Sequence, residues 1–208
     1  MRVAIVGGTG PFGKALATRL AGSEHDVVIG SRDTGRAAAA AGEVGAGAEG
    51  AANEDAVQAA DLVVLATKAE AALETARELR AAIGTTPVLS VASELQFAPV
   101  GVLPSPEAAS LAERVQLELA GPVVAGLHSL AAASLGADEA PDEDALVCGD
   151  DADAKALALE LAAELVSGRA LDAGPLASAR ALEGMIAVAI NLNKRYRGHA
   201  GIRVTGLP

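Results

Sequence analysis

The chain has 208 residues, of which 51% are hydrophobic, enough for a large core and too many for a disordered protein. Its formal net charge of −11 argues against nucleic acid as a partner, because nucleic-acid-binding surfaces are basic. The single cysteine, Cys148, excludes a disulfide framework and a cysteine-based metal site, so we expect a buried thiol and no bound metal.

The first half of the chain alternates predicted strands with predicted helices. The mostly β-branched run at residues 3–6 predicts a buried strand, and residues 14–21 predict the first helix. Further strands are expected in residues 25–31, 42–51, 61–67 and 86–92, and further helices over 34–43, 53–60 (with Asn53 as the N-cap) and 70–82. This alternation predicts an α/β fold of the Rossmann type, a doubly wound parallel sheet whose ligand lies beyond the carboxyl ends of the strands.

The pattern changes after residue 97. Three prolines within residues 99–106 predict a loop over the edge of the sheet. We then expect a helix over 106–119, a strand that ends near His128, a strand to Cys148, a helix over 155–166, a short strand in 168–174 and a helix over 178–196. Residues 1–125 are therefore predicted to form a dinucleotide-binding domain, and residues 126–208 a small C-terminal α/β cap.

A glycine-rich loop joins the first predicted strand to the first helix. Gly8, Gly10 and Gly13 match the pattern G-x-G-x-x-G, which takes the pyrophosphate of a dinucleotide. Gly8 permits the tight turn, Gly10 lets the pyrophosphate approach the backbone, and Gly13 allows the helix to pack against the strand. The amino end of the helix then supplies free N–H groups to the phosphates, and Thr9 adds a hydroxyl.

The end of the second predicted strand indicates which dinucleotide binds. Where an NAD-binding chain usually has Asp or Glu, this sequence reads Ser31-Arg32. A carboxylate would repel a 2′-phosphate, whereas the Arg32 guanidinium offers it charged donors, with Ser31 and Arg36 as further contacts. The alternative is that Arg32 is a solvated loop residue. The pattern favours NADP.

Two further features allow a structural and a functional interpretation. His128 follows a predicted strand on the ligand side of the sheet, although a single histidine is more often structural. Near the end of the chain, residues 193–203 hold a basic cluster of Lys194, Arg195, Arg197, His199 and Arg203. In so acidic a chain this cluster is either a solvated helix end or an anion site, and its spacing does not separate the two.

The sequence resembles a known family in five segments: RVAIVGGTGPFGKALATRLA, HDVVIGSRD, LVCGDD, LDAGPLASARALE and INLNKRYRGHAGIRVT. These look like the F420H2:NADP oxidoreductases, also called NADPH-dependent F420 reductases, and the last segment is similar to actinobacterial members. The resemblance implies an enzyme that passes a hydride directly between NADP(H) and the deazaflavin coenzyme F420. It implies no catalytic side chain, because the protein need only hold the two rings face to face.

The resemblance also implies roles for particular positions. In that family the NADP phosphates lie on positions that match Thr9, Ser31 and Arg32. The position that matches His128 lies beside the deazaflavin, and the helix at residues 191–193 closes the same cleft. F420 carries a phosphate and a glutamate tail, for which the basic cluster is a natural counterpart. The predicted cofactor-binding residues are Gly8, Thr9, Gly10, Pro11, Phe12, Gly13, Ser31, Arg32, Arg36, Thr67, His128, Asn191, Asn193, Lys194, Arg195 and Arg197.

Two loops depart from the family pattern. Residues 67–70 read TKAE where the family usually has a proline, and residues 90–97 read SVASELQF in place of an Asn-Pro pair or a proline-rich equivalent. Both loops are expected against the nicotinamide, so two alternatives stay open. One is an NADPH-dependent reductase of a small carbonyl or imine, with Tyr196 and either Lys194 or Lys68 as the proton donor. The other is a non-catalytic NADP-binding redox sensor.

The sequence also predicts where and how the protein occurs. It shows no signal peptide and no apolar run near the ~20 residues that a membrane span needs, so we expect a cytoplasmic protein. The apolar segment at residues 181–193 exceeds what a small cap needs to bury. As in the resembled family, it predicts a homodimer.

Overall fold

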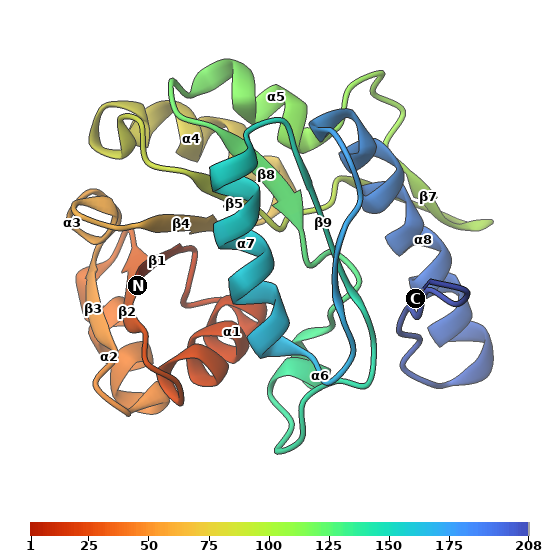
Figure 1. Cartoon of the computed structure of the whole chain (residues 1–208), viewed down its shortest axis with the longest axis horizontal. Coiled ribbons are helices and arrows are strands. Elements are labelled where there is room, and N and C mark those ends of the chain that lie inside the picture. Colours follow the sequence, from red (N-terminus) through yellow and green to blue (C-terminus); the bar gives the residue numbers. More distant parts are fainter. Residues whose placement is uncertain (208) are drawn as a thin grey trace.

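The computed structural model describes residues 1–207 and has one central sheet with helices on both faces (Figure 1). The strands of the sheet are β1 (Arg2–Val6), β2 (Asp26–Ser31), β3 (Glu49–Ala52), β4 (Leu62–Leu65), β5 (Val88–Ser90), β8 (Val123–Gly126), β9 (Ala145–Gly149) and β10 (Ala170–Asp172). They lie in the order β10-β9-β8-β5-β4-β1-β2-β3. A separate two-stranded hairpin consists of β6 (Leu95–Ala98) and β7 (Gly101–Pro104).

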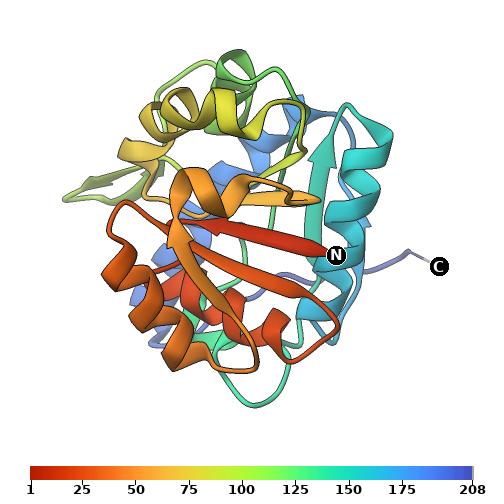
Figure 2. The same cartoon turned by 90° about the vertical axis from the view of Figure 1, so that its left-hand side faces the viewer.

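The helices divide between the two faces of the sheet, as Figure 2 shows for its N-terminal half. They are α1 (Pro11–Ala21), α2 (Thr34–Val44), α3 (Asn53–Val57), α4 (Ala69–Ile83), α5 (Leu111–Glu118), α6 (Ala132–Leu135), α7 (Ala152–Leu165) and α8 (Ala179–Tyr196), with a 3₁₀ turn at Leu176–Ser178. α1, α2 and α7 pack on Val3 and Ile5 of β1. α3, α4 and α5 pack on Ala4 and Val6. Because side chains alternate along a strand, β1 serves two cores and is apolar at each of these positions.

The strand order confirms the Rossmann-type fold. β1 pairs in parallel with both β2 and β4, with Val3 opposite Val27 on one side and Leu62 on the other. The carboxyl ends of these three strands therefore lie at the same edge of the sheet. The chain reverses its direction of strand addition between β1 and β4, and sheets of this kind leave a crevice for a ligand at that point.

Two N-terminal helices have boundaries that differ from those expected. α1 begins at Pro11 rather than at residue 14, because proline fits the first turn of a helix, where its missing N–H is not needed. α3 ends at Val57 instead of residue 60. The prediction that Asn53 is an N-cap is wrong: Ala52 holds the cap position, and no side chain caps this helix.

Caps also set the start of two later helices. α5 begins at Leu111, five residues later than expected, because Ser110 and Glu113 form a reciprocal capping box. α7 begins at Ala152, three residues earlier than expected, because the Asp151 side chain accepts a hydrogen bond from the backbone N–H of Ala154 at 2.8 Å. The short helix α6 was not expected from the sequence.

The sequence predicted a loop at the prolines after residue 97. The structure has a β-hairpin there instead. β6 and β7 are antiparallel, with Phe97 opposite Val102. Pro99 lies in the connection between the strands and Pro104 at the end of β7. These are positions where a missing N–H removes no necessary bond from the ladder, so proline is compatible with the hairpin.

The C-terminal strands extend the same sheet. β8 pairs in parallel with β5, whereas β9 runs antiparallel to β8, and β10 pairs in parallel with β9. The predicted domain boundary at residues 125 and 126 falls inside β8, so the sheet is continuous across it. That residues 126–208 behave as a separate unit stays a prediction. What stands beside the sheet is the β6–β7 hairpin with α8 (Figure 1).

Three smaller findings bear on function. Between residues 1 and 207 no helix has both the length and the apolar character to cross a membrane. Cys148 is fully buried, and burial raises the pKa of its thiol to about 11, so it stays protonated and unreactive. The described residues contain no group of three His, Cys, Asp or Glu that could hold a metal ion.

Candidate functional site

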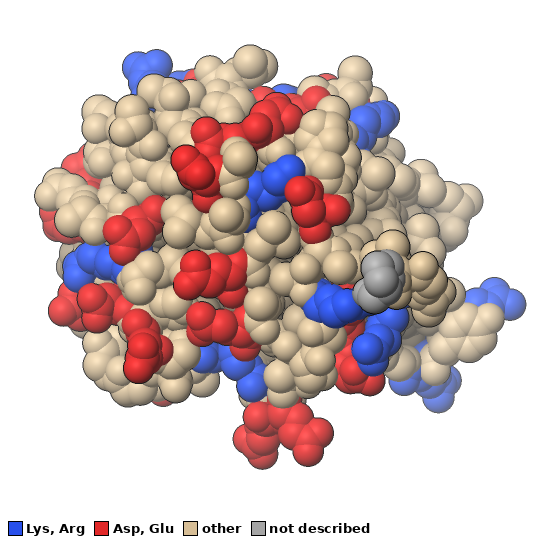
Figure 3. All heavy atoms as spheres, in the orientation of Figure 1, with Lys and Arg blue, Asp and Glu red and all other residues tan. Residues whose placement is uncertain are grey.

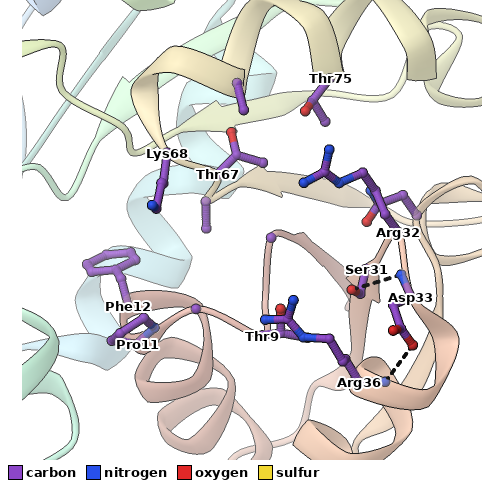
Figure 4. Close-up of a pocket in the computed structure, with 15 residues that line it drawn as sticks. Thr9, Pro11, Phe12, Ser31, Arg32, Asp33, Arg36, Thr67, Lys68 and Thr75 are labelled. Atoms are coloured by element: carbon purple, nitrogen blue, oxygen red, sulfur yellow. Dashed lines mark hydrogen bonds between the residues drawn. The ribbon is translucent and has the colours of Figure 1, made fainter.

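A cavity of about 580 Å³ opens at the carboxyl ends of β1, β2 and β4 (Figure 4). This is the edge where the strand order reverses, and a cavity of this size suits a cofactor or substrate. Its lining comes from the ends of the three strands and the loops after them and from the starts of α1, α2, α3 and α4: Gly7, Thr9, Gly10, Pro11, Phe12, Ser31, Arg32, Asp33, Arg36, Asn53, Ala66, Thr67, Lys68, Ala71 and Thr75. Eight of the residues predicted from the sequence are in this set: Thr9, Gly10, Pro11, Phe12, Ser31, Arg32, Arg36 and Thr67.

The other two glycines of the loop lie beneath the cavity and shape it. A Cβ on Gly13 would lie 2.6 Å from the Cα of Gly8, and a Cβ on Gly8 would lie 2.8 Å from the backbone oxygen of Ile5. Both distances are shorter than the contacts that real Cβ atoms make. The turn after β1 is therefore this tight only with glycine at position 8, and α1 approaches it this closely only with glycine at position 13. The glycines thus bring the start of α1 to the cavity.

The amino end of α1 faces the cavity without a competing acceptor. Its N-cap is Gly10, no side chain caps it, and its first turn contains no acidic residue. Backbone N–H groups at such an end have no partner within the helix and carry the positive end of its dipole. The cavity therefore has a built anion site on this side.

Two arginines enter the cavity from the loop after β2 and the start of α2. Figure 4 shows the Arg32 and Arg36 side chains extending into it from the same wall. The neighbouring carboxylate of Asp33 is occupied as the cap of α2, since it accepts a hydrogen bond from the N–H of Arg36 at 3.0 Å. Ser31 Oγ accepts from the N–H of Asp33 at 3.2 Å, which leaves its hydroxyl proton free to donate. No ion pair between described residues involves either arginine.

Two polar groups of the cavity lining lack partners, one on the loop after β4 and one at the start of α3, beside β2. Thr67 Oγ1 and Asn53 Oδ1 are buried and make no hydrogen bond to any described residue, and both residues line the cavity. Buried polar atoms without partners are rare in native proteins, so these two indicate where a ligand makes contact. The sequence interpretation missed Asn53, Ala71 and Thr75. The last two share one face of α4 at a spacing of four residues, a signal that helix periodicity contains.

His128 lies apart from this cavity, after β8. Its Nδ1 lies 3.2 Å from Ser93 Oγ, and its Nε2 is buried without a partner among the described residues. Burial lowers the pKa of His128 to about 4, and a backbone hydrogen bond at Val91 opposes this only in part. The ring is therefore neutral at pH 7. It borders a hollow of about 10 Å³ together with Ser129, Leu146, Leu182 and Met185.

The predicted residues of α8 have partners that the sequence did not reveal. Asn191 Oδ1 accepts from the N–H of Val102 at 2.9 Å while its Nδ2 donates to the Val102 carbonyl at 2.8 Å, which ties α8 to β7. Asn193 Oδ1 accepts from the N–H of Ala200 at 2.5 Å. Lys194 Nζ lies 5.7 Å from the centre of the Phe97 ring, within range of a cation–π contact.

The remaining members of the basic cluster differ in their freedom. Arg203 pairs with Asp142 at 2.5 Å, in the tail that follows α8. Arg195 and Arg197 are exposed, and in the described part of the chain neither forms an ion pair. Figure 3 shows basic side chains gathered at the lower right, near the C-terminal end of α8, while acidic side chains prevail over much of the remaining face.

Comparison with known proteins places these features in a family. Residues 2–94 match the family model described as NADP oxidoreductase, coenzyme F420-dependent. The F420-dependent NADP reductase of Methanothermobacter thermautotrophicus is 35% identical over the whole chain and 96% of that protein. The enzyme of the same name from Methanocaldococcus jannaschii is 34% identical over the whole chain and 99% of that protein.

Solved structures agree with this relationship. A structure from Arthrobacter sp. FB24, described as a candidate F420-dependent NADP reductase, superposes with a TM-score of 0.82 at 27% identity and covers 99% of this chain and 100% of its own. An imine reductase from Streptomyces aurantiacus superposes with a TM-score of 0.64 at 24% identity, covering 95% of this chain and 62% of its own, which shows a shared fold alone. The finer resemblance to actinobacterial members stays a prediction. The chain belongs to the F420-dependent NADP reductase family.

Proposed function

We propose that this protein is an oxidoreductase that transfers a hydride directly between NADP(H) and coenzyme F420. One observation carries the proposal: in a chain related over its full length to F420-dependent NADP reductases, Arg32 after β2 and Arg36 at the start of α2 line a cavity beside a glycine loop, and neither forms an ion pair with a described residue. That is the place where a Rossmann-type site meets the 2′ position of the adenosine ribose.

The large cavity fits NADP(H) from one end to the other. Arg32 and Arg36 form charge-assisted hydrogen bonds to the 2′-phosphate, with the Ser31 hydroxyl as a further donor. The amino end of α1 binds the pyrophosphate. The unpartnered oxygens of Asn53 and Thr67 accept hydrogen bonds from the nucleotide, which accounts for their burial without protein partners.

The F420 side fits in its chemistry but has little room. F420 is an anion with a phosphate and a glutamate tail, and Arg195 and Arg197 are exposed cations without partners among residues 1–207. His128 contributes a neutral ring whose Nε2 is free for a hydrogen bond. The hollow beside it holds about 10 Å³, so F420 binding requires that this region widen.

Catalysis in this proposal rests on position. When both are bound, the nicotinamide and the deazaflavin exchange a hydride without help from a side chain. The protein holds one ring at the mouth of the cavity and the other near His128, and excludes water between them with aliphatic side chains such as Leu182 and Met185. His128 is not a proton donor at pH 7, because burial lowers its pKa to about 4.

The alternative reductase of a small carbonyl has less support. Its candidate donors do not assemble: Tyr196 is 72% exposed near the end of α8, Lys194 lies over Phe97, and Lys68 lines the nucleotide cavity. A non-catalytic redox sensor would not need to bind F420. The buried Nε2 of His128, which has no partner among the described residues, gives no support to that interpretation.

The homodimer is part of the same proposal. The β6–β7 hairpin and α8, which pack against each other, both expose large apolar side chains: Phe97, Val100, Leu103, Val188 and Leu192. Exposed apolar side chains on two packed elements are usual at protein interfaces, and a second copy of the chain would cover them. Sedimentation of the purified protein measures its mass in solution, which we expect to be twice the 20.5 kDa of one chain. The cytoplasmic location expected from the sequence stays a prediction.

A simple assay tests the proposed reaction. Purified protein is mixed with oxidised F420 and NADPH, and in parallel with F420 and NADH, while the visible absorbance of the deazaflavin is followed. We expect the absorbance to fall with NADPH and to change far more slowly with NADH. No loss with either nucleotide would contradict the proposal, and turnover of NADPH on a carbonyl or imine instead would favour the alternative reductase.

A further inference from the structure

Lys68 occupies a position in the cavity that the proposed roles of the other residues leave unexplained. It follows β4 and holds the N-cap position of α4, without capping that helix through its side chain. Figure 4 shows its side chain extending from the start of α4 toward Pro11 and Phe12 at the start of α1. The lysine thus extends into the cavity from the wall that faces the start of α1.

The charges of the cavity are divided between its two sides. Arg32 and Arg36 enter together from the wall formed by the end of β2 and the start of α2, and Asp33 is occupied as a helix cap. Lys14, one turn into α1, does not line the cavity, and its Nζ lies 2.7 Å from the carboxylate of Glu43. In Figure 4 the Arg36 guanidinium extends toward Thr9 of the glycine loop, whereas Lys68 lies over Pro11 and Phe12, the first residues of α1. Lys68 forms no ion pair with any described residue.

We propose that Lys68 binds the pyrophosphate of NADP(H), together with the backbone N–H groups at the amino end of α1. This inference rests on the proposed binding of NADP in the cavity. An ammonium group on a flexible stem acts as a point charge on phosphate and does not need the bidentate geometry of arginine. The pyrophosphate is common to NADP and NAD, so Lys68 adds affinity for both, while Arg32 and Arg36 discriminate between them.

Binding titrations with nucleotide fragments test this division of labour. Isothermal titration calorimetry measures the Kd of wild type and Lys68→Met for NADP, for NAD, and for adenosine 2′-phosphate, which lacks the pyrophosphate. Loss of one charge-assisted contact predicts a rise of about tenfold in Kd for both NADP and NAD. Adenosine 2′-phosphate is expected to bind both proteins within about twofold of each other, and Lys68→Arg to keep most of the affinity.

The matched control is Lys14→Met, which removes the same charge from a lysine that is paired with Glu43 and does not line the cavity. We expect it to leave all three affinities within about twofold of wild type, because an exposed ion pair contributes little. A general effect of net charge would instead appear in both variants.

Several results would overturn the inference. Unchanged affinity of Lys68→Met for NADP and NAD would show that the lysine does not touch the nucleotide. A loss confined to NADP would place it on the 2′-phosphate. If wild type itself fails to bind NADP, the proposed function fails with it. If wild type and Lys68→Met bind NADP equally well, the role of Lys68 is refuted and the proposed function is not.

Discussion

The nucleotide cavity and the region around His128 and α8, the two halves of the proposed active site, differ in how far each is formed before its ligand binds. The cavity is already about 580 Å³ in volume, and backbone features build much of it: a glycine loop, a helix end and the ends of three parallel strands. The hollow at His128 is about 10 Å³, and side chains from the loop after β8, from β9 and from α8 line it. One half is formed before binding, and the other has to be completed by it.

This contrast has an energetic side. A preformed cavity with fixed donors costs little reorganisation when its ligand arrives, so its affinity depends on a few charged contacts. The other region keeps exposed apolar and basic side chains in water, and its ligand must widen the hollow before it gains their contacts. We therefore expect changes in the cavity to affect NADP alone, and changes near α8 to affect F420 alone.

The largest expected effect comes from Arg32→Asp. The substitution removes a charge-assisted phosphate contact and adds a repulsion, so we expect kcat/KM for NADPH to fall by about one to three orders of magnitude. Use of NADH should be unchanged or improved, and the KM for F420 should not move. Steady-state kinetics with both nucleotides measures this.

Arg80→Asp makes the same charge change at an exposed position of α4 outside the cavity lining, and it serves as the control. NADPH kinetics that respond equally to both substitutions would mean that overall charge, and not the phosphate contact, sets the affinity. The contrast between the two regions would then lose its first support.

A second effect concerns stability and pH. Burial lowers the pKa of His128 to about 4, below its ordinary value of 6.5, so the unfolded chain takes up a proton on acidification before the folded protein does. Stability from this group is present above pH 6.5 and is lost as the pH falls toward 4, by about 2 kcal/mol between pH 7 and pH 5.

Urea denaturation of wild type and His128→Gln at pH 7 and pH 5 tests the sign and the size. We expect wild type to lose about 2 kcal/mol more than the variant over this interval, since the variant has no ring to protonate. Equal losses in the two proteins would mean that the His128 ring is open to water in solution and that the hollow is already wider than in this structure.

The smallest expected effect concerns the basic end of α8. In Arg195→Glu/Arg197→Glu, two exposed cations become anions that repel the phosphate and glutamate tail of F420, and we expect the Kd for F420 to rise about tenfold. NADP affinity should stay within about twofold. Fluorescence titration with F420 measures the change, and the deazaflavin chromophore without its phosphate and tail is the matched ligand. Equal weakening of NADP and F420 binding would contradict the separation of the two regions.

The sequence predicted the nucleotide half of the site better than the other half. The glycine loop and Ser31-Arg32 sit next to strands whose pattern is clear, so local spacing is enough to place them at the sheet edge. Asn53 and Thr75 escaped notice because they reach the cavity only through the packing of α3 and α4 on the sheet. The residues around Asn53 do not separate a ligand contact from a helix cap. The spacing of Thr75 from Ala71 predicts a shared helix face, but not that this face meets a ligand.

In the C-terminal half, the spacing of residues in the sequence predicts even less about which side chains make contact. Five basic residues within a short segment look alike in the sequence, yet Arg203 pairs with Asp142, 61 residues away, and Lys194 lies over Phe97. These contacts depend on how the tail and the hairpin return to α8, which no local pattern specifies. The prolines at 99 and 104 likewise indicated a break in structure, where the fold has a hairpin.

Asn191 makes the hairpin and α8 a single mechanical unit. Its amide pairs with both the N–H and the carbonyl of Val102, as a neighbouring strand would, and a Cβ on Gly101 would lie 2.9 Å from its Oδ1. Neither element can swing outward without the other unless both bonds break at once. In the region proposed for F420, the hairpin and α8 therefore move together, and the residue that joins them, Asn191, lies 89 residues along the chain from Val102.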